Sequence, residues 1–228
     1  AGIIMGTWVA GRVAHKKDAW DVLPWVVIPG VIGARLYHVI DWWWYYRDHL
    51  SLIPAVWTGG LGIFGGIFGG ILGLWLWCRR HQQKLVEWLD FVAVGLPLGQ
   101  AIGRWGNYFN QELYGLKTDL PWGIYIQAAG ARFHPLFAYE SLWDLVVFAV
   151  VSLRLPRFHS GQVRSGPAGR SGDVFALYLG LYSLGRFGLE WLRLESWPVN
   201  KIISLGLVVL SWIWLWTRNK RNLSFSWF

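Results

Sequence analysis

The sequence contains little charge and almost no cysteine. Only 15% of its 228 residues are charged, whereas 54% are hydrophobic. A soluble domain carries about 25% charged residues, so this composition excludes an ordinary soluble fold and indicates a membrane protein. The single cysteine, Cys78, excludes a disulfide framework within the chain. It stands beside Arg79 and Arg80 at the end of an apolar run, which favours a structural thiol over a nucleophile.

Two further features are missing: a charged leader with a cleavage site, and an internal repeat. The chain opens with Ala1 in apolar sequence, which we interpret as the tail of a first span that begins upstream. A transporter is usually built from two related halves, so the missing repeat disfavours that class. The net charge of +8 does not indicate nucleic-acid binding, because the basic residues lie in short loops between apolar runs.

Seven apolar runs predict an all-α polytopic membrane protein that forms a single domain over residues 1–228. A membrane-spanning helix needs about 20 mostly apolar residues. The predicted spans are 1–11, which is truncated, and 22–44, 55–78, 86–104, 136–155, 173–191 and 199–217. The long segment 105–135 is rich in Gly, Pro and polar residues, and we expect it to fold over the membrane surface as an outer-face loop subdomain.

The distribution of Lys and Arg predicts the orientation in the membrane. The loops after the first, third, fifth and seventh runs hold 13 of the 21 basic residues: Arg12, Lys16, Lys17, Arg79, Arg80, Lys84, Arg154, Arg157, Arg164, Arg170, Arg218, Lys220 and Arg221. The positive-inside rule places these loops in the cytoplasm. The loops 45–54, 105–135 and 192–198 then lie on the outer face.

Three polar segments stand at the ends of apolar runs, at or near this outer face. They are GRWGNYFNQE at 103–112, HPLFAYE at 134–140 and YSLGRFGLEWLR at 182–193. Charged and amide side chains at membrane depth are costly, so they normally face a protein interior and mark a functional site. Three such segments on three spans predict one shared site.

Arginine and glutamate spacing indicates what this site binds. Tyr182, Arg186 and Glu190 recur every four residues and form one stripe on a helix, and Arg104 shares a face with Asn107. Two guanidiniums from different helices can clamp a phosphate. The acids that would hold the arginines or move protons are Glu112, Glu140 and Glu190. The alternative is that Arg186 and Glu190 only neutralise each other.

Two histidines are candidates for acid–base work. His134 precedes Pro135 at a helix entry and is followed by Tyr139. His134 either titrates near neutral pH or anchors the loop by a hydrogen bond. His38 lies three residues after Arg35 inside the second run, and Asp41 is the expected partner of that arginine.

The third run carries glycines at a four-residue spacing, in GGLGIFGGIFGGILG at 59–73. Small residues at this spacing predict close helix packing in lipid. Glycines such as Gly65 and Gly66 also let a lipid headgroup approach the backbone. The G-x-G-x-x-G match at Gly60, Gly62 and Gly65 is a chance one, because no strand precedes it.

Four motifs occur together in one order: GARLYHV at 33–39, GRWGNYFNQELYG at 103–115, HPLFAYE at 134–140 and Y-x-x-x-R-F-x-x-E at 182–190. With the seven runs, they resemble the prolipoprotein diacylglyceryl transferase family through nearly the whole chain. The resemblance implies transfer of the diacylglyceryl group of phosphatidylglycerol to the lipobox cysteine thiol of a prolipoprotein. A thioether forms and glycerol phosphate leaves. It also implies a bacterial inner-membrane protein whose active face is outward, with no cofactor and no metal.

The resemblance also implies roles for individual residues. Arg104 and Arg186 would bind the phosphate. The other catalytic candidates are Glu112, Glu190 and His134. The substrate-binding candidates are Arg35, His38, Asn107, Asn110, Gly115, Tyr139, Glu140, Tyr182, Gly65 and Gly66.

One position departs from the family pattern. Many members carry a histidine before the Gly-Gly of the third span, and this chain has Phe64 there. The base that activates the substrate thiol is then His134, His38 or a carboxylate, or else the field of the arginines suffices. The departure keeps open a non-catalytic relative that binds lipid. A transporter with an intramembrane Arg/Glu/His path is the other alternative.

Overall fold

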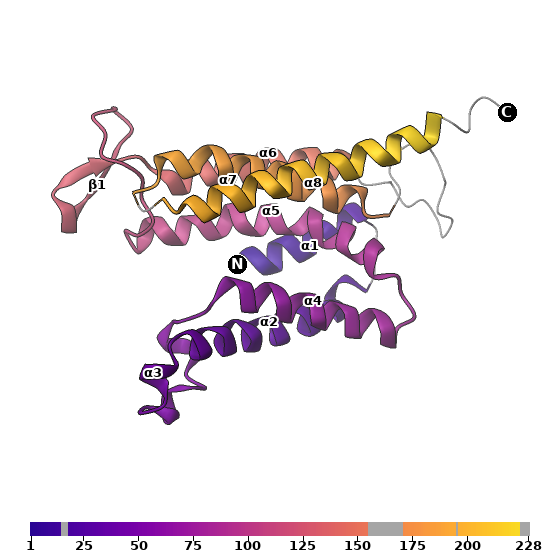
Figure 1. The fold of residues 1–228 in the computed structure, drawn as a ribbon, viewed down its shortest axis with the longest axis horizontal. Coiled ribbons are helices and arrows are strands. Elements are labelled where there is room, and N and C mark those ends of the chain that lie inside the picture. Colours follow the sequence, from indigo (N-terminus) through magenta and orange to yellow (C-terminus); the bar gives the residue numbers. More distant parts are fainter. Residues whose placement is uncertain (15–17, 155–170, 195, 224–228) are drawn as a thin grey trace. The chain divides into compact units, whose positions relative to one another are not determined.

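The structure is a computed structural model that describes residues 1–14, 18–154, 171–194 and 196–223. Figure 1 shows that the chain is mostly helical. It divides into two compact units, one of Lys16–Trp88 and one of Ala1–His15 with Leu89–Phe228. The expectation of a single domain over residues 1–228 stays a prediction.

The unit Lys16–Trp88 is built on two helices, α2 (Ala19–Asp41) and α4 (Ile63–Arg80), which pack side by side (Figure 1). Glycines bring them together. A Cβ added at Gly65 would overlap the backbone of Gly33, and one at Gly69 would overlap the carbonyl oxygen of Pro29. The prediction from the glycine spacing is therefore confirmed: the small residues let the backbones of α2 and α4 approach closely.

The connection between α2 and α4 consists of short turns. These are α3 (Trp43–Tyr46), η1 (Leu50–Leu52) and η2 (Val56–Thr58). Gly59 and Gly60 follow with φ angles of 84° and 70°, which side chains rarely tolerate. The third predicted span, 55–78, is therefore wrong at its start: its helix begins only at Ile63.

The other unit contains a bundle of four long helices. They are α5 (Leu85–Phe109, which crosses the unit boundary), α6 (Leu136–Arg154), α7 (Asp173–Leu189) and α8 (Pro198–Leu223), and they lie alongside one another (Figure 1). Helix α7 packs against both α6 and α8. Helix α1 (Gly2–Ala14) approaches α5 so closely that a Cβ at Gly2 would lie 2.6 Å from the carbonyl oxygen of Gly99.

A carboxylate on α5 fixes the start of α7. The Gly172 amide donates to Asp90 Oδ2 at 2.6 Å, and the Phe175 amide donates to Oδ1 at 2.8 Å. The first N–H groups of a helix have no partner within it, so an acceptor from a neighbouring helix stabilises this end. Asp90 thereby sets the position of α7 along α5.

The segment 105–135 contains a small antiparallel sheet. Strands β1 (Ile124–Ile126) and β2 (Ala131–Phe133) pair with Ile124 opposite Phe133, and they are joined by η3 (Gln127–Ala129). The all-α prediction is incomplete at this point. An antiparallel bridge between Gly115 and Arg193 ties the segment to η4 (Glu190–Leu192), the turn that ends α7.

Within the described residues, each of the seven apolar runs contains a helix, and outside the third run the helix ends lie within six residues of the predicted bounds. Four are long and apolar enough to cross a membrane: Ala19–Asp41, Leu85–Phe109, Leu136–Arg154 and Pro198–Arg218. The chain is thus a polytopic helical membrane protein, and seven spans stay a prediction. Of the predicted inner-loop residues, Lys16, Lys17, Arg157, Arg164 and Arg170 lie outside the described residues.

Candidate active site

The carboxylate of Glu140 on α6 joins two arginines from two other helices. Arg104 on α5 pairs with Glu140 Oε2 through Nε at 2.9 Å. Arg186 on α7 donates through Nη1 to Oε1 at 2.6 Å. Glu140 is only 5% exposed, so the three charges lie together in the helix bundle. A buried charge is stable only when it is paired and hydrogen-bonded, and this arrangement meets that requirement.

A second carboxylate and a third arginine extend the cluster. Glu190 Oε2 lies 3.4 Å from both Arg186 Nη2 and Arg193 Nε. Arg193 also reaches Glu140 Oε1, at 3.2 Å. Asn200 donates to the other oxygen of Glu190 at 3.2 Å. Arg186 and Glu190 therefore do pair, as their spacing predicts, but as part of a larger network rather than as an isolated pair.

The cluster opens into a small pocket. Its lining residues come from α5, α6 and α7: Arg104, Glu140, Trp143, Asp144, Tyr182, Gly185, Arg186 and Leu189. The prediction that separate polar segments meet at one site is confirmed for Arg104, Glu140, Tyr182, Arg186 and Glu190.

Arg104 and Arg186 keep N–H groups that their ion pairs do not use. A guanidinium has five N–H groups. In the part of the chain that the structure describes, Arg104 pairs through Nε alone, and Arg186 through one contact from each terminal nitrogen. The ion pairs hold the two groups in place while further N–H groups remain for an anion. Among these same described residues, no three His, Cys, Asp or Glu side chains group as metal ligands.

Among the described residues, the predicted residues of the outer loop form no ion pair with the network, although the backbone of Gly115 bridges to that of Arg193. Glu112 is exposed and accepts a hydrogen bond from Asn110 Nδ2 at 3.0 Å. Asn107 is half-buried one turn beyond Arg104. Gly115 is buried, and a Cβ there would lie 2.8 Å from both His134 Cβ and the carbonyl oxygen of Leu192. This close packing explains why position 115 carries a glycine.

His134 takes part in a hydrogen-bonded chain in the same loop. Its Nδ1 lies 3.3 Å from the hydroxyl of Tyr139, which accepts a hydrogen bond from Trp122 Nε1 at 2.8 Å. The arrangement matches the interpretation of His134 as a loop anchor. His134 and Tyr139 are not among the residues that line the pocket.

Arg35, in the other unit, holds a loop. Its guanidinium donates to the carbonyl oxygens of Leu52, Ile53, Gly59 and Gly60, at distances of 2.5–3.1 Å. The expectation that Asp41 pairs with Arg35 is wrong: the described partners are these four carbonyls, and Asp41 is exposed at the end of α2. A loop folded back over the guanidinium satisfies the buried charge without a carboxylate.

The remaining predicted residues of this unit surround the start of α4. His38 is half-buried, with its ring centroid 5.8 Å from that of Tyr46. Gly65 is buried against α2, and Gly66 is half-buried beside Ala34. These contacts assign a packing role to both glycines, and their contact with a lipid headgroup stays a prediction.

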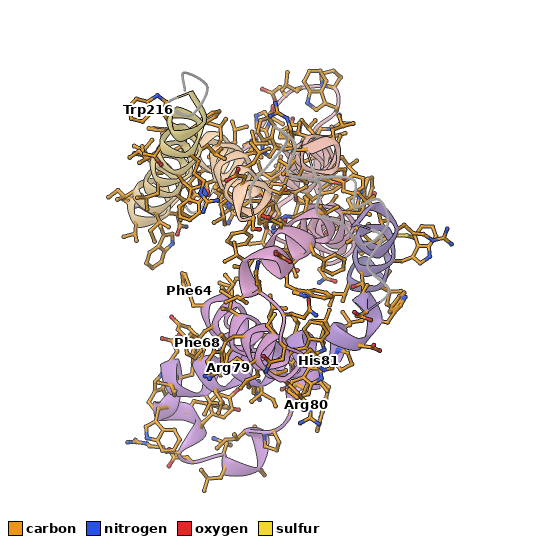
Figure 2. The ribbon with its side chains drawn as sticks, turned by 90° about the vertical axis from the view of Figure 1, so that its right-hand side faces the viewer. Phe64, Phe68, Arg79, Arg80, His81 and Trp216 are labelled. Carbon is orange, nitrogen blue, oxygen red and sulfur yellow. The ribbon has the colours of Figure 1, made fainter. Side chains whose placement is uncertain are left out.

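Phe64, at the position where the family resemblance implies a histidine, is exposed. Its side chain is 58% exposed, and that of Phe68, one turn further along, is 72% exposed. Figure 2 shows both projecting from the same side of α4. Arg79 and Arg80 end that helix. A phenyl ring has no group that accepts a proton, so position 64 cannot supply the base.

Sequence reasoning missed six residues of the site. Arg193 and Asn200 join the ion-pair network, and Trp143, Asp144, Gly185 and Leu189 line the pocket. Signals for two of them exist in the sequence. Asp144 is an acid within an apolar run, one helical turn after Glu140, and Arg193 follows Glu190 by three residues. Nothing in the spacing distinguishes Trp143 from the other tryptophans.

Fold and site together define a class: a polytopic helical membrane protein with a buried arginine–carboxylate pocket between three helices. Comparison with known proteins makes this specific. The chain belongs to the prolipoprotein diacylglyceryl transferase family, whose model matches residues 1–217.

Similar proteins from three bacteria carry the name phosphatidylglycerol–prolipoprotein diacylglyceryl transferase. The protein of Gloeobacter violaceus is 39% identical over 97% of this chain and 87% of its own length. One from Streptomyces coelicolor, numbered 2, is 45% identical over 83% of this chain and 60% of its own length. The protein of Acaryochloris marina is 35% identical over 96% of this chain and 85% of its own length.

Proposed function

We propose that this chain transfers the diacylglyceryl group of phosphatidylglycerol to the lipobox cysteine thiol of a prolipoprotein. The observation that carries the proposal is the meeting of Arg104 and Arg186 on the two oxygens of Glu140 inside one pocket. The names of the relatives supply the two substrates.

The two arginines suit the leaving group of this reaction. The substrate sulfur forms a bond to the glyceryl carbon, the bond from that carbon to the phosphate oxygen breaks, and its electron pair leaves with glycerol phosphate. Negative charge therefore grows on the phosphate. Fixed donors in a site of low dielectric stabilise such charge strongly, because they need no reorganisation during the reaction. Glu140 fixes both guanidiniums by direct pairing.

The attacking thiol belongs to the substrate. Cys78 of this chain is buried at the end of α4 and lies beside Arg79 and Arg80. A free thiol has a pKa of about 8.5, so a positive field that stabilises the thiolate raises its reactivity near neutral pH. In this proposal the field of Arg104 and Arg186 supplies that effect. The proton leaves to a group of the outer loop or to water.

The outer loop is the proposed contact for the prolipoprotein. Glu112 and Asn110 are exposed at its start, His134 is half-buried at its end, and Tyr139 is half-buried in the first turn of α6. The bridge from Gly115 to Arg193 connects this loop to the ion-pair network. A peptide that binds the loop would thus be held next to the arginines.

The proposed location is the bacterial inner membrane, with seven spans and the active face outward. Its support is the excess of Lys and Arg in the predicted inner loops. The test is Asn110→Cys in a Cys78→Ala background, labelled with a membrane-impermeant maleimide in spheroplasts. Labelling of intact spheroplasts is expected, and labelling only after lysis would contradict the orientation.

The transfer itself is tested with purified protein, phosphatidylglycerol vesicles and a lipobox peptide. We expect the peptide to gain the mass of one diacylglyceryl unit, with the Gloeobacter violaceus relative as the positive control. Binding of phosphatidylglycerol without a mass gain, where the relative works, would indicate a non-catalytic lipid binder. Passage of a solute across the membrane without a mass gain would indicate a transporter.

A further inference from the structure

Asp144 on α6 is the acid of the pocket that the proposed chemistry leaves unused. It is 2% exposed and lines the same pocket as Arg104 and Arg186. Its Oδ2 atom is buried and, among the described residues, has no hydrogen-bond partner. Asp144 stands one helical turn from Glu140, on the same face of α6.

The other buried acids of this unit are in a different situation. Glu140 pairs with three arginines, and both oxygens of Glu190 have donors. Asp90 accepts from two backbone amides. A buried polar atom without a partner is costly, so its presence in a pocket calls for an explanation. Asp144 lines the pocket that also holds the two guanidiniums, so a bound substrate is a candidate partner for its unpartnered oxygen.

The surroundings of Asp144 indicate the chemistry of the missing donor. The same pocket presents two guanidiniums that pair with Glu140 and keep further N–H groups, and these N–H groups can donate to an anion. A ligand with phosphate on the arginines and a neutral hydroxyl nearby satisfies both features. A cationic headgroup amine would lie beside two guanidiniums of the same charge, which is unfavourable.

We infer that Asp144 is a specificity-determining residue whose free oxygen accepts a hydrogen bond from a hydroxyl of the lipid headgroup, while Arg104 and Arg186 hold the phosphate. The inference rests on the proposed function, because it concerns the lipid that the reaction consumes. It assigns to Asp144 the selection of a glycerol headgroup over headgroups without a hydroxyl.

The experiment compares two lipids with the same acyl chains: phosphatidylglycerol and phosphatidylpropanol, whose headgroup lacks both free hydroxyls. The measurement is kcat/KM for transfer to the lipobox peptide from each lipid, expressed as a ratio. Leaving a buried acceptor without its donor is costly, which predicts that the wild type prefers phosphatidylglycerol by about tenfold. Phosphatidylethanolamine is a third arm that reports on a cationic headgroup.

The variants separate headgroup selection from a structural role. Asp144→Ala should bring the ratio close to one. It should lower kcat/KM for phosphatidylglycerol and leave kcat/KM for phosphatidylpropanol unchanged. Asp144→Asn keeps one acceptor oxygen, so its ratio should lie between those of the wild type and Asp144→Ala. If Asp144→Ala does not fold, Asp144→Asn provides the test. The matched control is Ser141→Ala: Ser141 is buried on the same helix and donates to the carbonyl oxygen of Ala101 at 2.9 Å. It should leave the ratio unchanged.

Each remaining outcome overturns the inference. An unchanged ratio in both Asp144 variants would mean that only water completes the oxygen. An equal loss with both lipids would assign Asp144 a structural role. Transfer from phosphatidylethanolamine that the wild type supports and both Asp144 variants lose, with the other two lipids unaffected, would mean that Asp144 binds an amine. If the wild type transfers from neither lipid while the relative does, the proposed function fails and the inference falls with it.

Discussion

The indole ring of Trp143 on α6 occupies the space that a side chain at Gly185 on α7 would need. A Cβ added at Gly185 would overlap the Cδ1 and Nε1 atoms of that ring. The ring is held there, because Nε1 donates to the carbonyl oxygen of Leu181 at 2.9 Å. Both residues line the pocket. The pocket wall therefore depends on the absence of a side chain at position 185.

Gly185→Ala should impair activity with only a modest loss of stability. The added methyl group displaces the indole and shifts the wall beside Arg186, and overpacking of this kind costs about 1–3 kcal/mol. We expect the rate of peptide lipidation, followed by mass spectrometry, to fall about tenfold, which corresponds to about 1.4 kcal/mol.

The same helix offers a control for this variant. A Cβ at Gly188 meets no atom within 4 Å. Gly188→Ala should keep the wild-type rate and should stabilise α7 slightly, because alanine has the higher helix propensity. Equal rates for the two variants would contradict the role given to the Trp143–Gly185 contact.

Asp90→Ala should lower the thermal stability of the bundle. The substitution removes the acceptor of two amides at the start of α7, and loss of a helix cap costs about 0.5–2 kcal/mol. Thermal unfolding followed by the fluorescence of the 19 tryptophans measures the change. Asp119→Ala, at an exposed carboxylate of the outer loop, is the control. No difference in Tm between the two variants would show that the cap contributes nothing.

Most helix positions in this fold were predictable from hydropathy, although the helix of the third run begins at Ile63 and not at residue 55. The runs 136–155 and 173–191 became α6 (Leu136–Arg154) and α7 (Asp173–Leu189) almost residue for residue. Lipid-spanning segments must satisfy their backbone internally, so long apolar runs have few alternatives to a helix. The two strands of the outer loop were missed because each has three residues, too short for a periodic signal.

The ion-pair partners of the site residues were predictable only in part. The Arg186–Glu190 pair follows from a four-residue spacing on one helix. The pairing of Arg104 with Glu140 joins residues on different helices, and no local pattern encodes it. The network also uses Arg193, which lies just beyond the end of α7, where helical periodicity no longer applies.

The error at Arg35 has the same origin. Sequence spacing proposed Asp41 as its partner, since a nearby acid is the simplest way to neutralise an arginine in an apolar run. The structure instead folds the 52–60 segment onto the guanidinium. Backbone carbonyls are present in every residue, so a sequence pattern cannot reveal such a partner.

Arg35→Lys should loosen the segment that these carbonyls belong to. Lysine keeps the charge but cannot reproduce the planar fork that serves four acceptors. We expect faster hydrogen exchange at residues 47–62. Arg47→Lys, at an exposed arginine paired with the exposed Asp48, should leave exchange there unchanged. Unaltered protection in Arg35→Lys would refute the role of this arginine as a loop clamp.

The joint role of Arg104 and Arg186 is tested most directly by the lipidation rate of the purified alanine variants with phosphatidylglycerol. Each should be reduced about 10²–10³-fold, the usual effect of losing one donor to a developing anion. The double variant should lose little more than either single one, because the two arginines act as a unit. Arg132→Ala, at an exposed arginine of β2, should keep the wild-type rate. Near-normal lipidation by either Arg104→Ala or Arg186→Ala would contradict the account.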